Sequence, residues 1–455
     1  MTPSDDFIAA TQALGAQRIE CALADFTSLA RGKWLAVDEF IAQRGCRLPN
    51  VLFGMTVTGG WPEHLFGTLM PNGYGDMQLV PDLATLRPRP GRAHEATVLC
   101  EAEGRWYSSA LGREVAASEL SPRSLLKKVL AQYAELGLQA TVAPELEMFL
   151  LQRKGATLQG ARPHPGAPSH ETTCEQYSLE RTAQFEPFFD ALFAGCETLG
   201  IPVSGHLHEA SLSQYEVNFR PGPALQQADA VFRFKRLARE IAARQGFQAS
   251  FAAKPFADQP GTGMHWHFSL QRMAGEWPHV FATPDGEASP ELMRFIAGLQ
   301  AHTPAAMALF APYDMSFDRI TLSDSSPTHA DWGLDDRHAA FRIPAATSPA
   351  AVRVENRLPG GDASPYLTVA ASLAFGLDGM QRRLEPSTGK HAAIALPRSL
   401  PDAIAALENN QPTRAILGEA MVALFVELKR NEHDEREATA HPRQDWDLTH
   451  LIDFA

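Results

Sequence analysis

The alternation of apolar and polar positions divides the chain into a short α+β part and a longer part of strands and amphipathic helices. In the first part, period-two alternation predicts strands at residues 18–25, 33–37 and 96–102, with a short helix at 37–45. Residues 54–75 are rich in Gly, Thr, Pro and Asn and predict a long loop. Residues 106–117 are polar and irregular, and we predict the domain boundary there, with domains at 1–112 and 113–455.

The second part carries helical patterns with a period near 3.6 residues and strand patterns between them. The helices are predicted at residues 124–136, 185–199, 225–245, 290–311, 366–380 and 404–430. The strands are predicted at residues 141–151, 201–209, 215–219, 338–344 and 351–357. Two further segments, 153–173 and 313–332, show no periodicity; we predict loops there, the second being a candidate flap.

The stretch from Gly261 to Leu270 (GTGMHWHFSL) predicts a strand that is entered through a glycine-rich turn. Because side chains alternate along a strand, His265 and His267 are expected on one face. Trp266 and Phe268 are expected on the other face, in the core. Two interpretations of this histidine pair stay open. It is either structural in a half-buried strand or a pair of ligands, since neutral histidine binds metals.

Composition limits the classes of protein to which the chain can belong. Its 455 residues exceed one ordinary core, and its net charge of −13 disfavours binding to nucleic acid or to an anionic membrane. No apolar run reaches the length of a membrane span and no secretory signal is seen, so we predict a cytoplasmic location. The five cysteines are scattered without C-x-x-C spacing, which indicates reduced, buried thiols.

Several glutamates stand on predicted strands among apolar neighbours. Glu145 and Glu147 share a face, and Glu209, Glu216 and Glu355 follow in later strands. Any one of them is most simply a solvated surface residue, but several in one sheet beside His265 predict a site for divalent cations, because buried unpaired carboxylates are costly. Oxygen ligands with one imidazole favour Mg²⁺ or Mn²⁺ over zinc.

Arginines form a second set of candidates: Arg319, Arg337, Arg342, Arg353 and Arg357. Surface salt bridges are the alternative interpretation. Arg342, Arg353 and Arg357, however, lie within apolar strand patterns, and guanidinium groups bind carboxylate and phosphate in a bidentate manner. Carboxylates, cations and arginines together suit phosphoryl transfer, and the sequence has no G-x-x-x-x-G-K-[ST] loop.

Six motifs in order carry a resemblance to a known family: APELEMFLL, HEASLSQYE, AAKPF, GTGMHWHFSL, DDRHAAFR and VRVENRLPGGDASPY. Together they resemble the glutamine synthetase superfamily, on its bacterial type I side, over residues 19–380. The resemblance implies a β-grasp domain at 1–112 and, at 113–455, a catalytic domain with a curved antiparallel sheet flanked by helices. It also implies a homo-oligomer, a dodecamer of two stacked hexameric rings with sites between subunits, that acts on ATP and L-glutamate.

The resemblance also implies roles for residues that match the family's motifs. For the first metal site these residues are Glu147, Glu209 and Glu216, and for the second they are Glu145, His265 and Glu355. For ATP they are His267, Ser269, Arg342 and Arg353. For glutamate they are Gly261, Arg319 and Arg357, together with Arg337, which also matches the arginine near the transferred phosphoryl group.

Departures from the family pattern bear on the acceptor. Where ammonia-using members carry an aspartate after a phenylalanine, this chain has Gly54, and Ser325 stands at the position of the flap glutamate. The last motif is most similar to that of γ-glutamyl-polyamine synthetases. We therefore expect an amine other than ammonia. Asp324 is a hypothetical base for that amine, with a loop cap or solvated charge as the alternative.

Three functions stay open at this stage. The first is an ATP-dependent ligase joining glutamate to a polyamine, monoamine, ethanolamine or aromatic amine. The second is an ordinary glutamine synthetase, and the third is a silent relative that binds an amine or serves in assembly. Met55, Trp61 and Phe66 suggest an apolar wall near the acceptor or, alternatively, a contact between subunits.

Overall fold

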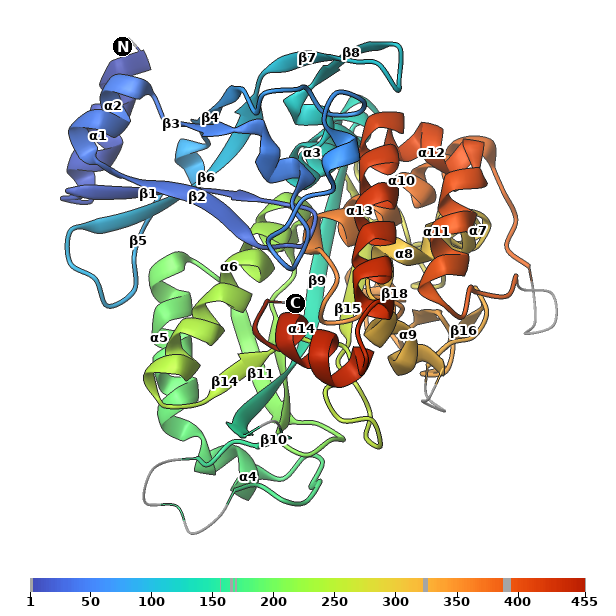
Figure 1. The fold of residues 1–455 in the computed structure, drawn as a ribbon. Coiled ribbons are helices and arrows are strands. Elements are labelled where there is room, and N and C mark those ends of the chain that lie inside the picture. The colour runs from blue at the N-terminus through green and yellow to red at the C-terminus, as the bar shows by residue number, and fades with distance from the viewer. Residues whose placement is uncertain are drawn as a thin grey trace.

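The computed structural model describes residues 3–155, 157–163, 167, 170–321, 326–387 and 394–454. Two large sheets are formed, one from the first 103 residues and one from residues 138–356, with helices around the second (Figure 1). The predicted α+β class is confirmed. No helix of this described part is long and apolar enough to cross a bilayer.

The N-terminal sheet has the strand order β2-β1-β6-β4-β3, with β5 paired to β6. β1 and β6 run parallel, and the other pairs are antiparallel. Two helices, α1 (Pro3–Ala13) and α2 (Val37–Gln43), accompany it. The strands are β1 (Arg18–Ala24), β2 (Ala30–Ala36), β3 (Cys46–Pro49), β4 (Asp76–Pro81), β5 (Arg87–Pro88) and β6 (Glu95–Glu103).

The larger sheet has the order β11-β12-β9-β15-β18-β17-β16, and the short strands β10, β13 and β14 also pair with β9. Its pairs are antiparallel except β16 with β17. The strands are β9 (Leu138–Lys154), β10 (Thr157–Gly160), β11 (Val203–His208), β12 (Gln214–Phe219), β13 (Gly222–Pro223), β14 (Gln248–Ser250), β15 (Met264–Arg272), β16 (Trp332–Leu334), β17 (Phe341–Ile343) and β18 (Val354–Asn356).

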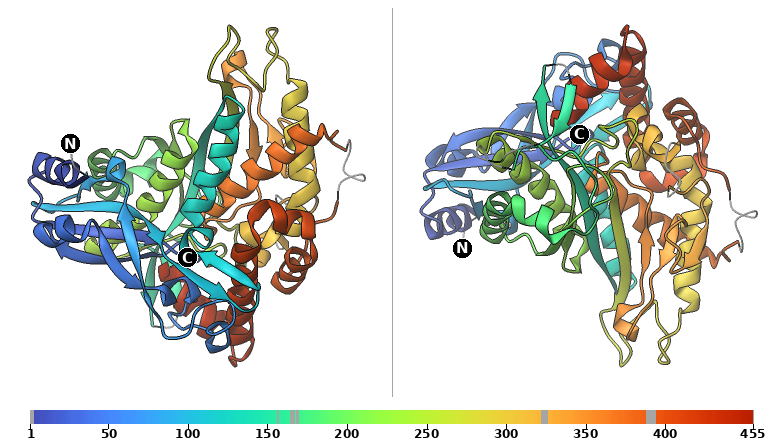
Figure 2. Two further views of the ribbon diagram at one scale, coloured as in Figure 1. Left: turned by 90° about the horizontal axis from the view of Figure 1, so that it is seen from above. Right: turned by 90° about the horizontal axis from the view of Figure 1, so that it is seen from below.

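Helices cover this sheet, with α6 packed on β9 and α10 packed against α3, α6 and α7. Figure 2 shows the N-terminal sheet (blue) at one end of the molecule and the C-terminal helices (orange to red) toward the other. The helices are α3 (Pro122–Glu135), α4 (Leu179–Gln184), α5 (Glu186–Leu199), α6 (Ala224–Arg244), α7 (Pro290–His302), α8 (Met307–Phe310), α9 (Asp314–Thr321), α10 (Pro365–Arg382), α11 (Leu400–Asn409), α12 (Gln411–Leu417), α13 (Glu419–Glu437) and α14 (Leu448–Phe454).

Several boundaries differ from the sequence prediction. The helix predicted at 404–430 is three helices, because Asn410 caps α12 through its side chain and Gly418, with φ 100°, separates α12 from α13. The helix predicted at 290–311 ends at His302, and Pro304 follows in a 3₁₀ turn. The segments predicted as irregular contain the hairpin β7 (Arg105–Ser108) and β8 (Arg113–Ala116), the strand β10 and the helix α9.

Candidate metal and nucleotide site

The site is built on the pairing of β15 with β9. Their antiparallel register places His265 opposite Glu145, and β18 places Glu355 opposite His267. Trp266 is fully buried, as is Phe268, so the predicted alternation of faces is confirmed. Apolar side chains that fix the strand in the core thus leave both histidines on the opposite face.

Glycines let the strands approach closely at the entry to β15. A Cβ atom on Gly263 would lie 2.5 Å from His265 Nε2 and 2.9 Å from Glu147 Oε1. A Cβ atom on Gly261 would lie 2.0 Å from the carbonyl oxygen of Ala253. A larger residue at either position would therefore displace the candidate ligands or break the turn.

The predicted ligands form two groups around His265. Glu145, His265 and Glu355 each offer one ligand atom within 4.8 Å of the others, and so do Glu147, Glu216 and His265. Glu209 lines the same cavity of about 490 Å³ as Glu147 and Glu216, which we call the Glu147 cavity. Its carboxylate accepts hydrogen bonds from Gln176 and from its neighbour's backbone.

Burial and mutual repulsion set the protonation of these groups. Burial, followed by the charge of Glu209, raises the pKa of Glu147 to about 7. Burial, followed by the charges of Glu145 and Glu147, raises the pKa of Glu216 to about 9. Burial also opposes ionisation of Glu145, but its contacts with His265 and His267 outweigh that effect and lower its pKa. Several of these carboxyls thus need a positive partner before they can all ionise together.

The donor set fits a divalent cation. Burial lowers the pKa of His265, which favours the neutral imidazole that a metal requires. His265 Nδ1 lies 3.8 Å from Glu145 Oε2 and 3.6 Å from Glu355 Oε1, beyond hydrogen-bond length. Ligands on opposite sides of an octahedral Mg²⁺ lie about 4 Å apart, so these groups have the spacing and the oxygen-rich chemistry for such an ion.

Two arginines neutralise the fully buried Glu355. Arg342 Nη1 donates to Glu355 Oε2 at 3.0 Å, and Arg357 Nη1 donates to Glu355 Oε1 at 2.8 Å. Arg342 also pairs with Asp335, and its contact with the candidate metal ligands is the one to Glu355. The strands around Glu355 are therefore bound together by charge as well as by backbone hydrogen bonds.

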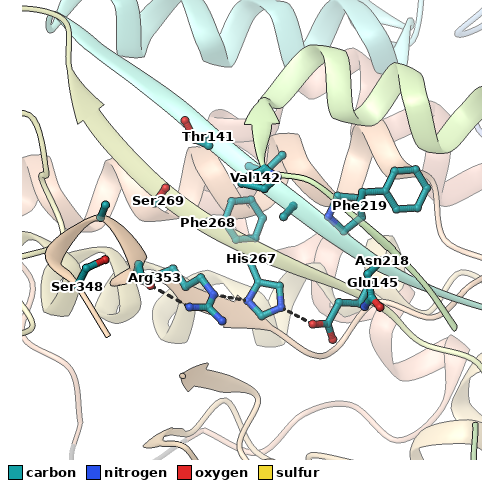
Figure 3. Close-up of a pocket in the computed structure, with 15 residues that line it drawn as sticks. Thr141, Val142, Glu145, Asn218, Phe219, His267, Phe268, Ser269, Ser348 and Arg353 are labelled. Carbon is teal, nitrogen blue, oxygen red and sulfur yellow. Dashed lines mark hydrogen bonds and ion pairs between the residues drawn. The ribbon is translucent and has the colours of Figure 1, made fainter. Parts of the chain in front are cut away.

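A second cavity, of about 470 Å³, lies on the other side of Glu145, and we call it the His267 cavity. Arg353 Nε donates to His267 Nδ1 at 3.2 Å, so His267 Nε2 carries the proton that is donated to Glu145 Oε1 at 2.9 Å (Figure 3). Ser269 lines this cavity beside apolar walls that include Phe219. An apolar cavity of this size with a few oriented polar groups is typical of a small-molecule site.

The predicted glutamate residues gather in the Glu147 cavity. Gly261, Arg319, Arg337 and Arg357 line it, so these four predicted residues are brought together there. Arg319 is buried and its guanidinium donates to the carbonyl oxygen of Leu358 at 2.9 Å. Arg337 is exposed at the rim. Asp324 and Ser325 lie outside the described residues.

Sequence reasoning missed the residues that hold these ligands in place. Gln214 Nε2 donates to Glu147 Oε2 at 2.7 Å, and Asn218 Nδ2 donates to Glu216 Oε1 at 2.8 Å. Both stand two positions from Glu216 on β12, so the period-two pattern Q-x-E-x-N was a readable signal. Glu171, which pairs with the buried His208, lies in a segment predicted as a loop and gave no signal.

The chain belongs to the glutamine synthetase family, because residues 119–448 match the glutamine synthetase catalytic domain. It is 30% identical to the gamma-glutamylputrescine synthetase of Escherichia coli K12, over 91% of this chain and 88% of that protein. It is also 30% identical to a glutamate–isopropylamine ligase of a Pseudomonas species, over 94% of each chain. The solved structure of GmaS with ADP superposes with a TM-score of 0.80 at 25% identity, covering 98% of both chains. The family resemblance predicted from the six motifs is confirmed.

Proposed function

We propose that this protein is an ATP-dependent ligase that joins the γ-carboxylate of L-glutamate to an amine other than ammonia. The observation that carries the proposal is the cluster of carboxylates and His265 between two cavities, with Glu145 lining both. Relatives named for putrescine and isopropylamine support an amine acceptor. The neutral residues at Gly54 and Ser325 support the exclusion of ammonia.

The proposed reaction places ATP in the His267 cavity and glutamate in the Glu147 cavity. Glu145, Glu147, Glu209, Glu216, His265 and Glu355 would hold Mg²⁺ or Mn²⁺, which neutralises phosphate charge when bound. Arg353 and His267 would position the nucleotide, with Ser269 at its edge and Arg342 acting through Glu355. Arg319 and Arg357 would orient glutamate, and Arg337 would face the transferred phosphoryl group, because positioning and charge dominate such transfers.

In the proposed chemistry the glutamate γ-carboxylate attacks the terminal phosphorus of ATP and ADP leaves. The amine nitrogen then forms a bond to the γ-carbon, inorganic phosphate leaves and the amine loses a proton. Asp324 remains the hypothesis for the group that takes this proton. Replacing Asp324 with Asn is expected to lower the rate most at low pH, and an unchanged pH profile would remove it from the mechanism.

We also propose an assembly and a location. Trp61 and Tyr74 are each 43% exposed and contact one another edge-to-face, and Phe66 also contacts Tyr74 edge-to-face. Such an aromatic surface supports the expected homo-oligomer, a dodecamer, which light scattering on the purified protein would detect. All five cysteines are free thiols, which supports a reducing compartment such as the cytoplasm.

Phosphate release tests the function. The purified protein with Mg²⁺, ATP and glutamate is offered ammonium and then mono-, di- and polyamines, ethanolamine and an aromatic amine. We expect phosphate release with an organic amine, and we expect it to require Mg²⁺, ATP and glutamate. Ammonium as the best acceptor would indicate a glutamine synthetase instead, and no release with any acceptor would contradict the ligase proposal.

A further inference from the structure

The exposed part of the Glu147 cavity lining defines its entrance. It consists of Gln176, Tyr177, Pro260, Arg337 and His338. An acceptor must pass these side chains to reach the carboxylate cluster. Their charges therefore act on any part of the acceptor that remains outside the reacting centre.

A positive group stands at this entrance. Arg337 is exposed there beside His338, whereas Arg357 lies deeper in the same cavity and is paired with Glu355. Two divalent cations in the cluster would offset the charges of Glu145, Glu147, Glu209 and Glu216, which line the same cavity, and the charge of Arg337 would remain. A second ammonium group held near the entrance would meet that like charge at short range.

The carboxylates beside the entrance already have cationic or hydrogen-bonding partners. Glu175 pairs with Arg181 through both oxygens, at 3.1 and 3.2 Å. Asp335 pairs with Arg342 at 2.5 Å. Asp336 accepts the backbone N–H of His338 at 2.9 Å. A new ammonium group would have to displace one of these partners to gain a counter-charge.

Part of the cavity wall is uncharged. Leu207 and Ala210 are half-buried in it, Pro327 is buried, and the Tyr177 side chain is 62% exposed at its edge. The Tyr177 backbone is held in the left-handed region, with φ 65°, by its N–H bond to the carbonyl oxygen of His208 at 2.9 Å. An alkyl or aryl substituent finds apolar contact on these surfaces.

We infer that the acceptor is a monoamine whose substituent is uncharged, an alkyl or aryl group, and that diamines and polyamines are poor acceptors. The inference rests on the proposed function, since it names the acceptor of the same reaction. Positive charge at the entrance selects against the second ammonium, and the apolar wall receives the substituent. Monoamines and diamines share the amino group that reacts, so only the group at the other end of the acceptor distinguishes them.

Butylamine and 1,4-diaminobutane test the inference, because they differ by the terminal ammonium alone. The kcat/KM for butylamine is expected to exceed that for the diamine by about tenfold or more at low ionic strength. 4-Amino-1-butanol, whose distal group is an uncharged hydroxyl, is expected to give a kcat/KM close to that of butylamine. Equal use or preference for the diamine would overturn the inference and leave the ligase proposal standing, whereas no turnover with any amine would remove the proposal itself.

A charge variant at the entrance provides a second test. It compares the ratio of kcat/KM for the two amines, and this ratio does not depend on the overall activity of the variant. His338→Glu is expected to lower the ratio of kcat/KM for butylamine to kcat/KM for the diamine by about threefold. This effect should become smaller in high salt. The matched His338→Gln variant is expected to change the ratio less. Asp324→Asn is expected to alter both amines in parallel. A selective change for the diamine in that variant would assign the distal ammonium to Asp324 and would contradict the inference.

Discussion

A buried pair formed by Glu171 and His208 behind the cluster makes the sharpest prediction. Glu171 is 2% exposed and His208 is fully buried, with His208 Nε2 2.5 Å from Glu171 Oε1. The other ring nitrogen lies 2.8 Å from the carbonyl oxygen of Glu209, so both nitrogens face acceptors. Glu171 also accepts the Ser213 N–H at 2.7 Å and the Tyr215 hydroxyl at 3.1 Å. The pair therefore fixes the turn that follows Glu209.

Replacing Glu171 with Gln keeps the shape of this side chain and removes its charge. The carboxylate accepts three hydrogen bonds, and losing one partner of a buried pair costs about 3–5 kcal/mol. Because Gln retains part of the bonding, we expect the free energy of unfolding to fall by about 3 kcal/mol. Loss of support for Glu209 is expected to weaken Mn²⁺ binding by about tenfold.

Urea denaturation and Mn²⁺ calorimetry of Glu171→Gln, His208→Gln and the double variant provide the assay. A coupling free energy of about 2 kcal/mol is expected between the two positions. Glu175→Gln is the matched control: Glu175 is exposed, so losing its pair with Arg181 should lower the free energy of unfolding far less than Glu171→Gln does. A Glu171→Gln variant as stable as the wild type would refute the charged pair and leave a neutral hydrogen bond in its place.

Three further predictions concern separate parts of the molecule. Arg353→Lys removes the guanidinium that donates to His267, so KM for ATP should rise about tenfold. The melting temperature should not change. An unchanged KM would exclude Arg353 from the nucleotide site. A thiol reagent should modify Cys174 rapidly in the native protein and the four buried cysteines only after unfolding; rapid reaction of more than one thiol would contradict the described burial. Burial of Lys235 lowers its pKa to about 7, so the unfolded chain binds the extra proton between pH 7 and its ordinary value of 10.5. Stability should therefore rise from pH 7 to pH 9, by up to about 1.4 kcal/mol per pH unit, and Lys235→Met should remove that part of the slope.

The site was largely predictable because its residues lie on strands. Period-two alternation placed His265 and Trp266 on opposite faces, and the structure shows Trp266 fully buried and His265 among the carboxylates. The order of the motifs then linked Glu145 and Glu355, which are far apart along the chain. Pairing of β15 with β9 and β18 is what brings them together, and local pattern alone contains no information about that pairing.

Other features depend on tertiary context that no local pattern reports. The hairpin of β7 and β8 has only Ser108 and Val115 buried, so it lacks the alternation that marks a strand. Helix α9 buries Met315, Phe317 and Ile320, but Arg319 is buried with them because it lines the Glu147 cavity, and this polar residue interrupts the apolar pattern. Glu171 lies in a segment without a helix or strand, and it meets His208 only in the folded structure.

The register of β9 ties the chemistry to the core. Leu146 and Met148 are fully buried on one face of this strand, while Glu145 and Glu147 face the cavities on the other. A slip of one residue would place both carboxylates in the apolar core and both apolar side chains on the cavity face. That exchange costs several kcal/mol for each uncompensated charge, in addition to the lost apolar burial. The hydrophobic pattern that stabilises the sheet is therefore sufficient to hold the two glutamates in the orientation that the proposed metal sites require.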